Sequence, residues 1–267
     1  MYYTIMKTHM CDIILVGDED GLTNLHLNTL KGKRSFEIDK KWTHNEEHFS
    51  DVIEQLRAYF RGELNTFSLK LNPKGSDYQK KVWNELRSIK FNEILSYKSV
   101  AIRLGNPKAS RAVGMANSKN PIPIIIPCHR VVASNGKLTG FAHGLEIKEK
   151  LINFEKMSDV FNKLADYYGD IKCLPVADEF IIVDRLEKPS FIIDTCTMQM
   201  FKRLGFSVPN DYDDFRLMIE DAMEIDAELY SRYHEFILEH SKYYCMKIPS
   251  CGGCPVYDLC DRNIQLI

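Results

Sequence analysis

The sequence predicts an α+β fold, in which a small antiparallel sheet is followed by a mainly helical segment. Residues 1–45 alternate apolar and polar side chains between Gly-Asp and Asp-Gly turn signals, a pattern typical of short paired strands. Two later stretches, 49–60 and 78–89, space their apolar residues at the helical interval instead. Strands that precede helices in this way build an α+β architecture.

Length and composition describe an ordinary globular chain with room for two domains. It has 267 residues, of which 45% are hydrophobic and 27% charged. No apolar run of about 18 residues occurs, and the N-terminus lacks the apolar core of a signal peptide. We therefore expect a cytoplasmic monomer without membrane association. In a reducing cytosol, the eight cysteines are better explained as ligands or nucleophiles than as disulfides.

The net charge changes sign along the chain. Residues 1–156 carry 24 Lys and Arg against 17 Asp and Glu, a net charge of +7. Residues 157–267 carry 11 against 20, a net charge of −9. A basic segment suits contact with phosphates and an acidic one does not, so we place a domain boundary between residues 156 and 157.

Residues 96–117 are predicted to form two helices around a tight turn. Ser96 is suited to cap the first helix, and Gly105 to end it in a left-handed conformation. Asn106 is then expected to cap the second helix, with Pro107 at its first position. This second helix resembles the recognition helix of a helix-turn-helix, although its small side chains suit helix packing equally well. The basic charge of the segment favours DNA binding, through Lys108, Ser110 and Arg111.

A cysteine flanked by proline and histidine is the most informative feature of the sequence. Cys128 stands in Pro127-Cys128-His129-Arg130, directly after the apolar run 122–126, which we expect to be strand-like. A thiol becomes a strong nucleophile as the thiolate, and a neighbouring base or cation lowers its pKa. The alternative is a buried structural cysteine, which needs neither flanking residue. The pattern therefore favours a nucleophile.

Three stretches resemble the O6-alkylguanine-DNA alkyltransferases, the methylated-DNA–protein-cysteine methyltransferases. They are 120–155 (NPIPIIIPCHRVVASNGKLTGFAHGLEIKEKLINFE), 75–114 (GSDYQKKVWNELRSIKFNEILSYKSVAIRLGNPKASRAVG) and 55–71 (QLRAYFRGELNTFSLKL). The resemblance implies an N-terminal α/β part at 1–72 and a DNA-binding catalytic domain at 73–156. It also implies direct repair of O6-alkylguanine in double-stranded DNA, with O4-alkylthymine as a second candidate lesion. The alkyl group moves irreversibly to Cys128 in a single turnover that needs no cofactor.

The resemblance further implies a role for each matching residue. His129 activates the thiol through a bridging water, Glu155 orients the histidine, and Tyr97 donates a proton or hydrogen bond to guanine. The damaged base has to leave the stack before a thiolate can reach it. The residues that would assist are Arg111 as the inserted side chain, Asn120 as a hinge, Phe141 as a stacking face and Ala142 as an N–H donor.

The residues alone leave other roles open. Glu155 also fits a solvated helix carboxylate, Tyr97 a half-buried aromatic, and Arg111 a phosphate clamp. Asn120 fits a purely structural role, since asparagine tolerates unusual backbone angles. His143 departs from the small residue of many family members, and either narrows the pocket or points into solvent. A Cys-His-Glu hydrolase is disfavoured, because nothing in the sequence indicates an oxyanion hole.

The C-terminal part contains four clustered cysteines, which indicate a metal or iron–sulfur site. They are Cys245, Cys251, Cys254 and Cys260, and their spacing alone does not exclude tetrahedral zinc. The stretches SFIIDTCTMQMFKRLGF and YHEFILEHSKYYCMKIPSCGGCPVYDLC resemble the C-terminal half of endonuclease III-like helix-hairpin-helix DNA glycosylases. This resemblance implies an all-α domain at 157–267 with a [4Fe–4S] cluster, zinc being the alternative.

The same region departs from the glycosylase pattern. Residues 173–178 lack both glycines of the expected hairpin, so the tight turn that offers N–H groups to a phosphate is in doubt. No lysine stands at the position of the bifunctional nucleophile, and the segment is short for that fold. We interpret it as a truncated relative that has lost base excision. The alternative is a two-function repair protein with glycosylase activity through Asp194.

Overall fold

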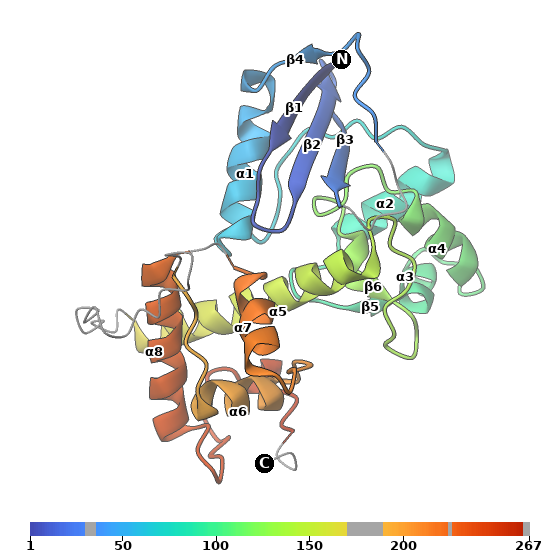
Figure 1. Cartoon of the computed structure of the whole chain (residues 1–267). Coiled ribbons are helices and arrows are strands. Elements are labelled where there is room, and N and C mark those ends of the chain that lie inside the picture. The colour runs from blue at the N-terminus through green and yellow to red at the C-terminus, as the bar shows by residue number, and fades with distance from the viewer. Residues whose placement is uncertain (30–35, 170–188, 224–225, 264–267) are drawn as a thin grey trace. The chain divides into compact units, whose positions relative to one another are not determined.

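The computed structural model describes residues 1–29, 36–169, 189–223 and 226–263. The chain forms two compact units, Met1–Ile152 and Asn153–Ile267. Helix α5, Leu145–Tyr168, begins in the first unit and continues into the second (Figure 1). The domain boundaries at 72/73 and 156/157 stay predictions.

The first unit opens with a four-stranded sheet of order β3-β2-β1-β4. The first three strands are antiparallel, as predicted, with register pairs Thr4↔Leu15 and Leu15↔Leu25. The short β4 pairs with β1 in parallel, through Tyr2↔Thr43, and leaves β3 as the other edge of the sheet. The strands are β1 Tyr2–Met6, β2 Asp12–Asp18, β3 Gly21–Asn28 and β4 Thr43–His44.

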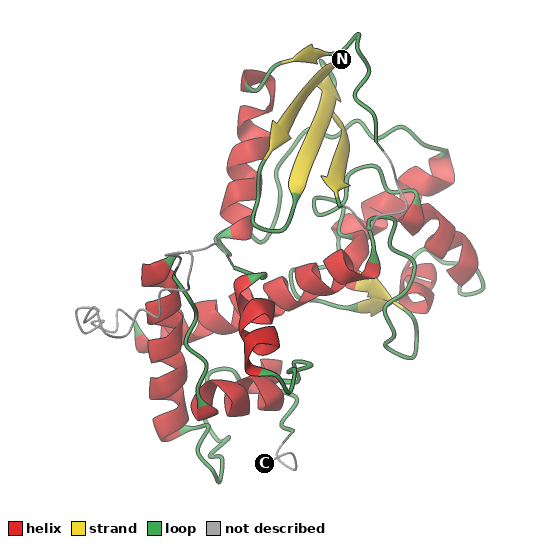
Figure 2. Ribbon diagram, in the orientation of Figure 1, coloured by secondary structure: helices red, strands yellow, loops and turns green. Residues whose placement is uncertain are grey.

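Helix α1, Ser50–Phe60, supplies the main apolar cover of this part and matches the predicted helix. It follows the short 3₁₀ turn η1, Glu47–Phe49, whose Phe49 ring lies against Gly17 of β2. Figure 2 shows the helical and stranded elements of this unit. Burial of the apolar helix face excludes water from the strands, which is the main stabilising effect. Its buried residues are Val52, Ile53, Leu56, Tyr59 and Phe60.

The second part of this unit is built from α2 Asp77–Arg87, α3 Tyr97–Arg103 and α4 Ser110–Ser118. The predicted ends of the first helix of the pair are confirmed, because Ser96 caps α3 and Gly105 has φ +77. The predicted start of the second helix is wrong. Asn106 instead opens a turn closed by the Ala109 N–H, 3.0 Å from its carbonyl, and α4 begins only at Ser110.

A two-stranded parallel pairing joins this helical part to the segment of Cys128. Strand β5, Leu95–Ser96, pairs with β6, Val131–Val132. The pairing places the start of α3 beside the chain that follows the cysteine. Trp83 of α2 donates to the Ala116 carbonyl of α4 at 2.9 Å, so the two helices are linked by a buried polar bond as well as by packing.

The regular elements described in the second unit are helical. Besides the rest of α5 they are α6 Thr195–Leu204, α7 Tyr212–Glu220, α8 Ala227–Tyr243 and the 3₁₀ turn η3 Tyr257–Leu259. Aromatic residues fill the core, and the Phe161 ring stacks on Tyr233 with centroids 3.8 Å apart. Across the ranges that the structure describes, no helix is long and apolar enough to span a bilayer.

Candidate active site

Cys128 begins a 3₁₀ turn, η2 Cys128–Arg130, and only 3% of its surface is exposed. The apolar run before it is not a strand, contrary to the prediction. Ile124 has φ +72, and the chain turns within residues 121–126. Pro121, Pro123 and Pro127 have no N–H to donate, so this segment could not complete a strand ladder. The cysteine therefore lies at the end of a tight turn.

Two asparagine side chains fix this turn. Asn120 donates from Nδ2 to the Ile126 carbonyl at 2.7 Å and accepts from the Ile122 N–H at 3.0 Å. Asn117 of α4 donates to the Cys128 carbonyl itself at 3.3 Å. Both asparagines are buried, so each bond replaces water at a backbone group that would otherwise be unsatisfied. Sequence reasoning missed Asn117.

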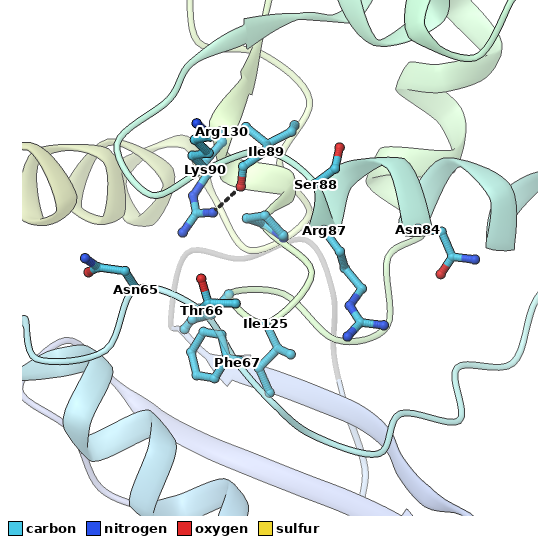
Figure 3. Close-up of a pocket in the computed structure, with 12 residues that line it drawn as sticks. Asn65, Thr66, Phe67, Asn84, Arg87, Ser88, Ile89, Lys90, Ile125 and Arg130 are labelled. Carbon is cyan, nitrogen blue, oxygen red and sulfur yellow. Dashed lines mark hydrogen bonds between the residues drawn. The ribbon is translucent and has the colours of Figure 1, made fainter.

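His129 and Arg130, the two residues that follow Cys128, are both buried. His129 is 0% exposed, which suits a base shielded from bulk water. Arg130 donates to the Ile89 carbonyl at 2.7 Å, as Figure 3 shows, and its guanidinium lies 5.7 Å from the centroid of the Phe91 ring. It also lines a cavity of about 440 Å³ with Arg87 and Lys90. Arg130 thus fastens the turn to the end of α2.

Tyr97 is brought to the cysteine segment by the β5–β6 pairing. Its hydroxyl donates to the Thr139 carbonyl at 3.0 Å. Burial raises the pKa of Tyr97, the bond to Thr139 opposes the rise, and negative charge on Cys128 adds to it. A tyrosine that keeps its proton beside a thiolate is suited to donate to a leaving group. The structure therefore brings Tyr97 and Cys128 together within one electrostatic environment.

Lys148 is a component of the site that sequence reasoning missed. It lies on α5, is 0% exposed, and donates to the Val131 carbonyl at 2.6 Å and the Thr139 carbonyl at 2.8 Å. Burial lowers the pKa of Lys148 to about 8, and the nearby Cys128 thiolate acts in the opposite direction. Its ammonium lies 5.9 Å from the centroid of the Tyr97 ring. Lys148 joins β6 to the following loop.

The loop between β6 and α5 carries the residues expected to cover the base. Phe141 is buried and Ala142 half-buried. The expectation that His143 points into solvent is wrong, and the expectation that it narrows the pocket stays a prediction. His143 is 3% exposed, and its Nδ1 lies 3.2 Å from the Leu27 carbonyl of β3. Its ring therefore faces the N-terminal sheet.

Glu155 lies further along α5 and is 1% exposed. It is two helical turns beyond Lys148 and therefore shares its face of the helix. The solvated-carboxylate interpretation is wrong for a side chain this deeply buried. Its predicted partnership with His129 stays a prediction.

The predicted DNA-contacting residues lie at the start of α4. Lys108 and Arg111 are exposed and Ser110 is half-buried. Exposed cations at this helix start are free to approach phosphates, because no acidic residue occupies its first turn. These three residues are neighbours in sequence at the start of this helix, whereas Asn120 is buried in the turn before Cys128.

In the second unit, the four clustered cysteines line one hollow of about 30 Å³ together with His240 and Met200. Hydrogen-bond donors face two of the sulfurs, because Arg203 lies 3.3 Å from Cys245 and the Arg262 N–H lies 3.4 Å from Cys260. His240 Nε2 lies 3.6 Å from the Cys254 sulfur. As the side chains stand, no three His, Cys, Asp or Glu residues in the described ranges are arranged to hold a metal ion.

Asp194 caps helix α6 rather than facing an open pocket as a free carboxylate. Its Oδ1 accepts from the Thr197 N–H at 2.7 Å and the Thr197 hydroxyl at 2.9 Å, and Oδ2 lies 3.1 Å from His234 Nε2. Burial alone would raise the pKa of Asp194, but these hydrogen bonds outweigh it and hold the pKa below its usual range. The candidate hairpin at 173–178 lies outside the described residues.

Comparison with known proteins identifies the first unit. The family model for the 6-O-methylguanine DNA methyltransferase ribonuclease-like domain matches residues 1–73, and the model for its DNA-binding domain matches 77–157. A methylated-DNA–protein-cysteine methyltransferase of Methanosarcina acetivorans is 52% identical over 155 residues, covering 58% of this chain and 98% of the relative. The constitutive enzyme of that name from Bacillus subtilis is 41% identical over 163 residues, covering 59% and 96%.

A solved structure supports the same family assignment. The crystal structure of Mycobacterium tuberculosis OGT in complex with DNA has a TM-score of 0.54 and 39% sequence identity, covering 59% of this chain and 94% of that one. The chain belongs to the methylated-DNA–protein-cysteine methyltransferase family. Both family models end by residue 157, so the membership rests on the sheet, the helices and the cysteine turn described above.

Proposed function

We propose that this chain repairs O6-alkylguanine in DNA directly, by accepting the alkyl group on Cys128. The observation that carries the proposal is a single buried thiol at the end of a fixed turn, next in sequence to a fully buried histidine. Tyr97 and Lys148 respond electrostatically to the same sulfur. The relatives matched over nearly their whole length carry the name of this activity.

The chemistry balances without a cofactor. His129 takes the thiol proton, the Cys128 sulfur attacks the alkyl carbon, and the bond from that carbon to guanine O6 breaks. The electron pair stays on guanine, which is neutralised by a proton donated from Tyr97. The product is a thioether, which acid–base chemistry does not hydrolyse, so each protein molecule acts once. Glu155 is proposed to orient His129, and Lys148 to hold the segments around the sulfur.

The DNA is proposed to bind along α4. Lys108 and Arg111 are exposed there, and α3 with α4 would act as a helix-turn-helix. Arg111 is proposed to occupy the gap left by the rotated nucleotide, while Phe141 stacks on the base and the Ala142 N–H faces O6. The related Mycobacterium tuberculosis protein was solved in complex with DNA. Duplex DNA with O6-methylguanine is the proposed substrate, and O4-alkylthymine a second.

A stoichiometric transfer assay tests this function. The protein is incubated with duplex DNA that carries a radiolabelled O6-methyl group, and the label on protein is counted. We expect one label per protein molecule, located on Cys128 by peptide mapping, and none with Cys128→Ala. The half-buried Cys11→Ala variant is the matched control and should transfer normally. Turnover beyond one equivalent, or undiminished transfer by Cys128→Ala, would contradict the proposal.

We also infer a metal centre in the second unit, held by Cys245, Cys251, Cys254 and Cys260. The donor set fits, since four thiols line one hollow and N–H groups face two of the sulfurs. The described side chains are not arranged around a metal ion as they stand, so the thiols would have to move to hold one. When bound, the centre would supply structural cross-linking between α8 and the C-terminal loop.

Metal analysis of anaerobically purified protein tests this inference. The glycosylase-like stretches favour a [4Fe–4S] cluster, which would give a brown protein with broad absorption near about 400 nm. A colourless protein that contains one equivalent of zinc would show that the four thiols hold tetrahedral zinc and not a cluster. Protein with neither metal, in which all four thiols react freely with a thiol reagent, would remove the metal centre altogether.

A further inference from the structure

Strand β3 is an edge of the sheet, and its outer edge is bonded to the segments that surround the cysteine. Leu25 donates its N–H to the Pro121 carbonyl at 2.8 Å, in the turn that leads to Cys128. Nearer the start of the strand, Leu22 donates to the Lys70 carbonyl at 2.9 Å. An unpaired strand edge leaves backbone groups to be satisfied by other segments, and here active-site segments supply part of that pairing.

His143 supplies the next bond along this edge. Its Nδ1 lies 3.2 Å from the Leu27 carbonyl, an arrangement that requires the proton on Nδ1. The hydroxyl of Thr29 donates to the His143 carbonyl at 2.9 Å, so side chain and backbone of one residue are both held. The His143 ring also contacts the Phe141 ring, with centroids 5.7 Å apart. His143 thus connects the end of β3 to the residue expected to stack on the base.

The other end of the same loop is held independently. The Thr139 carbonyl accepts from both Tyr97 and Lys148. Gly140 follows Thr139, and Gly144 follows His143. Their φ angles are +65 and +101, values that residues other than glycine rarely adopt. The three residues between the glycines therefore form a short segment between two positions that favour glycine. The His143 bonds fasten the far end of this segment to the sheet, and Gly144 connects it to the start of α5.

We propose that His143 is a positioning residue, which fastens the base-covering loop to the edge of the N-terminal sheet and so holds Phe141 over the substrate base. The proposal rests on the alkyl-transfer function and extends it, because it gives the sheet a part in the reaction. Without the bond to Leu27, the segment between the two glycines would sample open conformations. The base would then occupy the reactive position for a smaller fraction of the time, and the transfer step would slow.

Single-turnover kinetics on the full chain test the proposal. Methyl transfer from O6-methylguanine duplex is followed at increasing DNA concentrations, which separates the saturating rate from the half-saturating concentration. His143→Leu keeps an apolar side chain of similar size but has no donor, and we expect its saturating rate to fall about fivefold, the equivalent of one hydrogen bond. His143→Asn places an amide N–H near the position of Nδ1 and should restore the rate to within about twofold of the parent protein.

Hydrogen exchange supplies a readout that does not depend on activity. Amides of 139–144 should exchange faster in His143→Leu and Thr29→Val, and at the parent rate in His143→Asn. His48→Leu is the control, because His48 packs on Tyr2 and Phe49 of the same unit. If His143→Leu does not fold, Thr29→Val carries the test, since it removes the second bond alone.

The outcomes separate the two proposals. A parent protein that transfers no label contradicts the alkyl-transfer function, while the exchange data still decide the role of His143. Unchanged saturating rate and unchanged exchange in His143→Leu would overturn the positioning role. An equal loss of rate in His48→Leu would overturn it as well, because it would show general destabilisation rather than release of the loop.

Discussion

Cys128 in the first unit and the four cysteines of the second unit all lie near chain turns, but their neighbours differ. Cys128 is followed in sequence by the buried His129, and its charge acts on Tyr97 and Lys148 from two other segments. Cys245, Cys251, Cys254 and Cys260 instead share one hollow with each other. A thiol faced by proton donors and acceptors suits reaction with an incoming group, whereas thiols that face one another suit a shared ligand.

The largest expected effect concerns the second set of thiols. Cys251→Ser should destabilise the second unit by more than about 4 kcal/mol, because loss of a metal ligand is among the few changes of that size. Thermal unfolding followed by circular dichroism and metal content checks this. Alkyl transfer should remain within about twofold, since no residue of that hollow is used in the reaction.

The matched control is Cys196→Ser, which changes a half-buried cysteine of α6 outside the four. Equal stability of the Cys251 and Cys196 variants would contradict a structural metal centre. A loss of alkyl transfer in Cys251→Ser, with the first unit still folded, would show that the two kinds of site are not independent.

The next effect concerns the turn that presents Cys128. Asn120→Ala removes the bonds to Ile126 and Ile122 and leaves two buried backbone groups without these partners. We expect a loss of about 2–3 kcal/mol in the free energy of unfolding and a slower transfer step at saturating DNA. Urea denaturation and single-turnover rates measure both. The exposed Asn106→Ala should change neither, and a transfer rate unaffected by Asn120→Ala would show that the turn need not be fixed.

Lys148 gives the first unit a pH dependence of its stability at alkaline pH. Its folded-state pKa of about 8 is below the usual lysine value, so from about pH 8 to 10.5 the unfolded chain binds more protons than the folded one. The free energy of unfolding should therefore rise with pH in this window, on the order of 2 kcal/mol relative to Lys148→Met. Denaturation of both proteins at several pH values tests the difference, and parallel curves would contradict it.

The smallest expected effect distinguishes a helix-capping role of Asp194 from a catalytic role. Asp194→Ala should destabilise the second unit by about 1 kcal/mol, the usual loss of an N-cap, while Asp194→Asn should retain most of the stability. Because hydrogen bonds hold the Asp194 pKa down, this stabilisation is present at neutral pH and is lost as the pH falls through the folded-state value. Abasic sites formed by the parent protein and abolished by Asp194→Asn would favour the glycosylase interpretation instead.

Helix caps, turn glycines and the alternation of apolar and polar residues predicted the strands and helix ends that depend on neighbouring residues. Ser96 as a cap, Gly105 as a left-handed terminator and the alternating strands all depend on near neighbours in sequence. The run 122–126 was wrongly expected to be a strand, because its apolar residues hid the effect of the prolines and of the Asn120 side chain. Tertiary bonds of this kind leave little trace in hydrophobic periodicity.

Long-range partners explain what sequence reasoning missed in the site. From the sequence alone, Lys148 is interpreted as a solvated helix lysine. It lies three residues before the buried Leu151 and seven before Glu155, a spacing that places all three on one helix face. That spacing was the available signal. His143 could not be placed, since its partners Leu27 and Thr29 are more than a hundred residues away.

The edge of β3 has a further consequence for how the protein behaves at high concentration. An exposed strand edge is a template on which strands of other molecules can add, and proteins protect such edges. In this chain Lys70, Pro121 and His143 all bond to groups of β3 or to the residue that follows it. The contacts that hold the cysteine turn and the loop before α5 therefore also prevent other molecules from adding a strand to β3. Variants that loosen them should precipitate sooner than their loss of folding stability alone would suggest.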